Sequence, residues 1–143
     1  MLVACFLITA LSSCAGGVSV SEAKQTSNEF LTLAVKGDYA EAEKFIHPDY
    51  DIPEEKLREF FDGYFANFEI DTSEGYEVKR YTNLNISFYS SKVNGSQCTL
   101  KFDIEIDGRV ISVTTQTVKN DLGYGIIFFN FSEPEQISTE TDA

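Results

Sequence analysis

The chain contains a single histidine, and it lies close in sequence to two carboxylates. His47 is followed by Pro48 and Asp49, and Asp51 comes two residues later. An imidazole beside a carboxylate is a pairing that general acid–base catalysis uses often. No serine or cysteine stands in a pattern that would add a nucleophile to this pair. His47 also lies where a short predicted helix ends, so we expect a helix-end residue favoured by the helix dipole, and we predict no catalytic residue.

Two further sets of residues have side chains that could bind a metal or act as a nucleophile, but the surrounding sequence does not match a known site. Asp49, Asp51, Glu54 and Glu55 crowd one loop, but the central glycine of an EF-hand calcium loop is missing. We therefore expect a solvated acidic loop and predict no metal site. Cys98 falls on the apolar side of a predicted strand, where a thiol acts as a small buried hydrophobe. No Walker loop, zinc spacing, nucleophile elbow or Rossmann glycine pattern is present, and we predict no cofactor.

A third motif with a known chemical role lies at the end of the apolar N-terminal stretch. Leu2 to Leu11 is uncharged, and it is about half the roughly 20 residues that a bilayer-spanning helix needs. It runs into Leu11-Ser12-Ser13-Cys14, an aliphatic residue and two small ones before a cysteine. This motif resembles the lipobox of bacterial lipoproteins. The resemblance implies that residues 1–13 are a signal peptide and that Cys14 carries a thioether-linked diacylglycerol.

Lipid attachment at Cys14 would fix the location of the chain. Two or more acyl chains, such as palmitate, anchor a protein stably, whereas a single chain binds marginally. We therefore expect attachment to the membrane through Cys14, at the extracytoplasmic face of a bacterial cell membrane or outer membrane. Residues 14–20 would then form a short uncharged tether. The alternative is an ordinary secreted protein cut between Ala10 and Gly17, in which Cys14 is incidental.

The charge of the chain limits its partners. It holds 11 Lys and Arg against 23 Asp and Glu, a net charge of −12, and no charged residue precedes Glu22. This balance argues against nucleic acid, which needs clusters of Lys and Arg, and against electrostatic binding to anionic lipid headgroups. Because Cys5 would leave with the signal peptide and Cys14 would be acylated, Cys98 has no partner for a disulfide.

The spacing of apolar residues predicts helices first and strands after them. We expect helices over residues 21–36 and from Asp38 to about Ile46, separated by Gly37, with Asp38 and Glu41 in a capping box. A third helix begins near Pro53 and carries a continuous apolar stripe of Leu57, Phe60, Phe61, Tyr64, Phe65 and Phe68.

After Glu74 the period of the pattern changes to two. Apolar residues at 98, 100, 102, 104 and 106 alternate with polar ones, so Asp103 and Glu105 face outward. Asn94-Gly95 and Asp107-Gly108 have the composition of hairpin turns. Helices followed by a meander of about four antiparallel strands define an α+β fold. We expect one domain over residues 21–132, cone-like, with about three helices on a curved sheet, and an acidic flexible tail over residues 133–143.

The segment from Phe30 to Pro48, with its Lys36-Gly37-Asp38-Tyr39 corner, carries a second resemblance. It is similar to the opening of small bacterial lipoprotein domains with a nuclear-transport-factor-like or cystatin-like fold. That fold often encloses a conical cavity between helix and sheet. Here such a cavity would be lined by aromatic side chains, with a tyrosine hydroxyl near them; these are Phe65, Phe88, Phe102, Phe128 and Tyr64. A filled aromatic core is the alternative.

The fold hosts unrelated activities, so the resemblance supports architecture more than function. We expect a surface-tethered domain for ligand binding or protein interaction in the bacterial envelope, without catalysis. Its partner would be an unknown small apolar ligand or an envelope protein. Two alternatives stay open. One is a small enzyme of the polyketide-cyclase or ketosteroid-isomerase type with an interior acid or base in a conical pocket, and the other is a structural or immunity-type module.

Overall fold

Helices come first along the chain and strands follow, as the change of period predicts. The computed structural model describes residues 17–137. The elements in order are α1 (Val20–Lys36), α2 (Tyr39–Glu43), α3 (Glu54–Asn67), β1 (Glu77–Ser90), β2 (Gly95–Ile106), β3 (Arg109–Asn120), β4 (Gly123–Phe131) and β5 (Glu135–Gln136). The predicted α+β class is confirmed.

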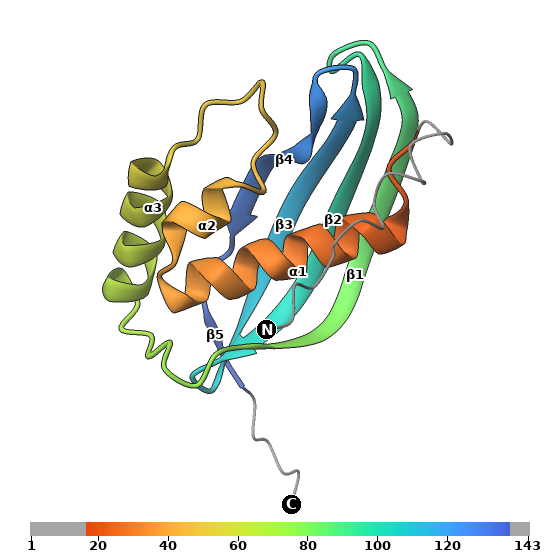
Figure 1. The fold of residues 1–143 in the computed structure, drawn as a ribbon. Coiled ribbons are helices and arrows are strands. Elements are labelled where there is room, and N and C mark those ends of the chain that lie inside the picture. The colour runs from red at the N-terminus through yellow and green to blue at the C-terminus, as the bar shows by residue number, and fades with distance from the viewer. Residues whose placement is uncertain (1–16, 138–143) are drawn as a thin grey trace, which may run out of the picture.

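The strands form one antiparallel sheet that curls around α1 as a half-barrel (Figure 1). Its order is β1-β2-β3-β4, and each strand pairs with the next along the chain. Asn94 and Asp107 have φ values of 51° and 49°, which confirms the two predicted turns. The short β5 was not predicted, because two residues have no alternation to read. It pairs Glu135 with Val110 at the start of β3, within the segment for which we expected a flexible tail.

The alternation of β2 is confirmed, and it decides which face of the sheet is the inside. Its apolar residues are almost completely buried: Cys98, Leu100, Phe102, Ile104 and Ile106. Helix α1 lies across this concave face (Figure 1). The polar residues between them, Asp103 among them, point to the convex face. There Arg80 Nε bonds Asp103 Oδ2 at 2.9 Å.

Aromatic rings fill the space between α3, α1 and β4. The ring of Phe129 on β4 lies 5.4 Å from that of Phe30 on α1 and 5.4 Å from that of Phe61 on α3, centroid to centroid. Phe60 meets the same ring at 5.0 Å. Such pairs add to the burial of apolar area that holds the layers together. The predicted stripe on α3 is confirmed, with Leu57, Phe61 and Phe65 buried.

The observed ends of the helices agree in part with those predicted from the sequence. Gly37 ends α1 in the left-handed conformation at φ 80°, as predicted. The Asp38 side chain caps α2 by accepting from the Glu41 N–H at 3.4 Å. The Glu41 carboxylate does not complete the capping box, since it bonds Lys44 Nζ at 2.9 Å. Pro53 is the N-cap of α3, so the helix begins at Glu54, close to the predicted start near Pro53.

The chain is already packed against the sheet before α1 begins. Val18 is only 3% exposed, and its N–H donates to the Ser96 Oγ at 2.6 Å. Ser19 then caps α1 by accepting from the Glu22 N–H at 3.0 Å. Residues 14–20 were predicted to be a tether. The described part of that segment is instead held to β2 by burial and a hydrogen bond.

The segment after α2 joins the helical layer to β4 through backbone hydrogen bonds. The His47 N–H donates to the Ile126 O at 2.9 Å, and the Ile126 N–H donates to the Phe45 O at 2.8 Å. A Cβ on Gly125 would lie only 2.4 Å from the His47 N. The approach therefore requires glycine at position 125.

The space around each glycine predicts opposite effects of alanine at Gly125 and at Gly63. Gly125→Ala should lower the free energy of unfolding by about 1–3 kcal/mol, because the new methyl group meets the His47 backbone. Gly63→Ala, inside α3 with open space around its Cα, should raise it by about 0.5–1 kcal/mol. Urea unfolding followed by circular dichroism measures both. Equal effects at the two positions would contradict this packing.

Candidate functional site

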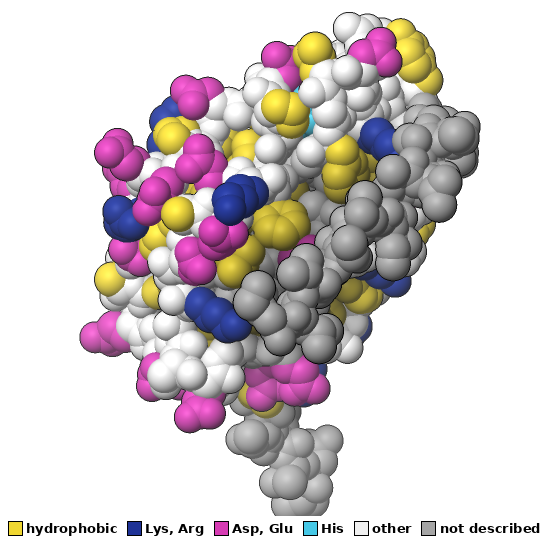
Figure 2. All heavy atoms as spheres, viewed as in Figure 1, with side chains coloured by type: hydrophobic (Ala, Val, Ile, Leu, Met, Phe, Trp, Pro, Cys, Tyr) yellow, Lys and Arg dark blue, Asp and Glu magenta, His cyan; other side chains and the backbone are white. Residues whose placement is uncertain are grey.

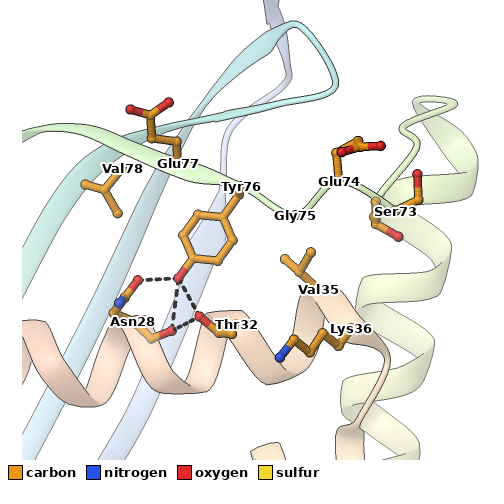
Figure 3. Close-up of a pocket in the computed structure, with 11 residues that line it drawn as sticks. Asn28, Thr32, Val35, Lys36, Ser73, Glu74, Gly75, Tyr76, Glu77 and Val78 are labelled. Atoms are coloured by element: carbon orange, nitrogen blue, oxygen red, sulfur yellow. Dashed lines mark hydrogen bonds between the residues drawn. The ribbon is translucent and has the colours of Figure 1, made fainter.

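A hollow of about 590 Å³ opens between the second half of α1 and the segment that leads into β1. Its wall on α1 consists of Asn28, Thr32, Val35 and Lys36, and residues 72–78 form the opposite wall. In Figure 3 the side chains of Tyr76, Val78 and Val35 point into the space between the helix and the strand, whereas the Glu74 and Glu77 carboxylates point away from the helix. We call this hollow the α1–β1 groove.

Tyr76 ties the two walls of the groove together. Its hydroxyl donates to the Asn28 backbone O at 2.9 Å and lies 3.1 Å from the Thr32 Oγ1 (Figure 3). The Asn28 side chain also contacts this hydroxyl. Burial raises the pKa of Tyr76, so the phenol stays protonated at neutral pH and serves as a fixed donor.

The groove combines an apolar part with polar groups of both charges. Val35 is buried and Val78 half-buried, and they provide an apolar surface inside it. Lys36 lies on the helix side and Glu74 on the opposite side (Figure 3). This arrangement can hold a small ligand that has a short apolar portion and polar ends.

The aromatic residues predicted to line a cavity are distributed over three parts of the structure. Phe65 is buried on α3, 6.1 Å from Phe61. Phe102 is buried under α1 on β2, 5.4 Å from Tyr81. Phe128 is 45% exposed, and it is paired with Gln116 on the convex face of the sheet. The Phe88 side chain lies outside what the structure describes. The structure therefore does not bring Phe65, Phe102 and Phe128 to one cavity.

The Tyr64 hydroxyl, predicted as a donor near the cavity, has a partner elsewhere. It donates to the Ser132 backbone O at 2.6 Å, and so links α3 to the residue after β4. Burial raises the pKa of Tyr64 to about 12. The side chain acts as a structural link between the two layers.

His47 is fully buried and uses both ring nitrogens. Nδ1 accepts from the Asp49 backbone N–H at 3.0 Å, so Nε2 carries the proton and donates to the Asn120 Oδ1 at 2.9 Å. Asn120 also donates through Nδ2 to the Val93 O at 2.7 Å. A pairing of His47 with the Asp49 or Asp51 carboxylate, the alternative to a helix-end role, is not among these contacts. No signal in the sequence pointed to Asn120, which lies 73 residues away.

Cys98 lies on the buried face of its strand, as predicted. Burial raises the pKa of its thiol. Within residues 17–137, no group of three His, Cys, Asp or Glu side chains is placed to hold a metal ion. In the same range, no helix has the length and apolar character needed to cross a bilayer. Cys14 lies outside the described residues.

The buried polar side chains of the described interior, His47 apart, are Ser and Thr hydroxyls. Ser27 on α1 and Thr115 on β3 pair at 2.7 Å, and Thr26 pairs with the Tyr124 hydroxyl at 2.7 Å. Among the described atoms, the Thr117 Oγ1 has no hydrogen-bond partner. A buried hydroxyl without a partner costs stability.

A scan against protein-family models finds no match to this chain, and a search of curated proteins finds no similar sequence. The fold defines the class: an α+β protein with N-terminal helices on a curled antiparallel sheet.

The two buried threonines of β3 predict a contrast. Thr117→Val should raise the free energy of unfolding by on the order of 0.5–1 kcal/mol, because it removes an unpaired hydroxyl at nearly constant volume. Thr115→Val should lower it by about 1–3 kcal/mol, because Ser27 loses its partner. Chemical unfolding at neutral pH checks both values. A loss of stability in Thr117→Val as large as that in Thr115→Val would refute this assignment.

Proposed function

We propose that the chain is a lipid-anchored binding domain of the bacterial cell envelope, held at the extracytoplasmic face through Cys14. The motif Leu11-Ser12-Ser13-Cys14 supports the anchor. The α1–α2 corner and the curled sheet support a nuclear-transport-factor-like or cystatin-like lipoprotein domain. The α1–β1 groove is the proposed binding site.

The observation that carries the proposal is where the folded domain begins. Only residues 15–17 separate Cys14 from Val18, which is buried and hydrogen-bonded to Ser96. An extended chain advances at most about 3.6 Å per residue, so the four steps from Cys14 to Val18 reach at most about 14 Å. An acyl group on Cys14 would hold the domain directly on the membrane surface.

The groove supports a small ligand with an apolar portion as the bound partner. The apolar surface of Val35 and Val78 favours burial of a short hydrocarbon group, and Lys36 and Glu74 offer opposite charges to its ends. A ligand of this kind can come from the membrane or from the envelope. The short tether keeps the domain as a whole near both.

The anchor is tested by labelling cells that express the full chain with an alkyne fatty acid. The wild-type chain should be labelled, and Cys14→Ser should not, because the acyl group is attached through the Cys14 thiol. Cys98→Ser is the matched control and should keep full label, since Cys98 is buried in the domain. Equal labelling of the wild type and Cys14→Ser would eliminate the anchor.

The groove is tested by native mass spectrometry of the protein extracted from its membrane. The wild type should retain a small bound molecule, and Val78→Trp should lose it, because the larger ring fills the groove. Val110→Trp, a similarly half-buried strand residue outside the groove, should retain the molecule. Retention by Val78→Trp, or a wild-type protein without any bound molecule, would rule out this site.

A further inference from the structure

We propose that one end of the sheet faces the bilayer and inserts Tyr89 and Leu122 into its headgroup layer. This hairpin end comprises the β1–β2 turn, the β3–β4 turn and the loop of residues 48–51. It is the upper end of the sheet in Figure 1. The inference rests on the proposed function, because the anchor at Cys14 determines which end lies near the membrane.

The tether joins the domain at the hairpin end. Val18 bonds Ser96, which is the second residue of β2 and directly follows the β1–β2 turn. Gly95 beside it pairs with Asn120, the last residue of β3. The chain from Cys14 therefore reaches the domain at the hairpin end. Because this chain spans at most about 14 Å, the opposite end of the sheet cannot lie at the membrane in place of the hairpin end.

Apolar side chains are exposed to solvent at the hairpin end. Tyr89 is 68% exposed and Leu122 62%, and both line a single hollow with Tyr50 and Val93. Tyrosine, with an apolar ring and a polar hydroxyl, is enriched where a protein meets the membrane–water interface. Exposed apolar side chains gathered at one end of a domain indicate a contact surface.

Side-chain hydrogen bonds hold the hairpin end in a fixed conformation. The Asn120 side chain accepts from the His47 Nε2 and from the Leu122 N–H at 3.0 Å, and it donates to the Val93 O. One half-buried amide thereby ties together the two strand turns and His47, which directly precedes the loop of residues 48–51. Contact surfaces that are already ordered lose less conformational entropy on binding than flexible loops do.

Acidic residues are distributed unevenly between the two ends of the sheet. Residues 84–100, the half of the β1–β2 hairpin next to its turn, hold one Lys and no Asp or Glu, whereas Lys79 and Arg80 near the other end of β1 pair with Glu105 and Asp103. Acidic residues gather at the opposite end, where Glu69, Asp71, Glu74, Asp107, Glu133 and Glu135 lie near strand ends and turns. Figure 2 also shows acidic side chains crowded over α3.

Three carboxylates at the hairpin end, those of Asp49, Asp51 and Asp121, oppose this trend. Asp49 and Asp121 line the same hollow as Lys92, so the hairpin end is not a basic patch. Contact with the membrane would be apolar in origin. The charge at the far end contributes by repelling anionic headgroups, which favours the orientation with that end away from the bilayer.

The chain contains no tryptophan, so a single introduced tryptophan is an unambiguous fluorescent reporter. The acylated full chain is reconstituted into phosphatidylcholine vesicles with a minor share of phosphatidylglycerol. Tyr89→Trp and Leu122→Trp should show emission shifted to shorter wavelength, and quenching by lipids brominated near the headgroup. Phe128→Trp is the matched control, because Phe128 is an exposed ring on the convex face. Its quenching should be severalfold weaker.

Each contrary result has a distinct meaning. If the wild type does not float with the vesicles, the anchor fails and the inference fails with it. If the protein floats but Tyr89→Trp and Leu122→Trp are quenched no more than Phe128→Trp, the orientation is wrong and the anchor stands. A blue shift that appears without lipid and grows with protein concentration would show that the hairpin end binds a second copy, and would overturn the membrane contact.

Discussion

The close approach of the segment after α2 to β4 is the contact on which the hairpin end depends. Two backbone hydrogen bonds join this segment to Ile126, and the absence of a side chain at Gly125 permits them. The approach places the buried His47 ring against Asn120, and Asn120 in turn fixes the two strand turns. The single histidine of the chain thus organises a surface, although its residue type first suggested acid–base chemistry.

The features that could be predicted from sequence are those encoded over a few neighbouring residues. The stripe on α3, the alternation of β2, the end of α1 at Gly37 and the turns at Asn94 and Asp107 each depend on local periodicity or on a residue that tolerates positive φ. Together they were sufficient for the α+β class and for the order of its elements. They placed Cys98 correctly inside the sheet.

The features that could not be predicted depend on contacts between distant segments. Asn120 and His47 are 73 residues apart, and neither carries a signal for the other. Residues 126–129 are all apolar, so the sequence could not show which rings face inward; a register shift after Gln116 turns Phe128 to the convex face. The α1–β1 groove was also missed, because residues 72–76 have no periodicity and their position follows from the Tyr76 contacts with α1.

In the proposed arrangement, a lipid on Cys14 and a tether of three residues hold the hairpin end on the membrane. Amide hydrogen exchange of the acylated chain, compared between vesicles and vesicle-free detergent, tests this claim most directly. Vesicles should slow exchange at residues 89–95 and 120–123 and should leave exchange in α3 and the β2–β3 turn unchanged. Slowed exchange over α3 or the β2–β3 turn, or no difference anywhere, would contradict it.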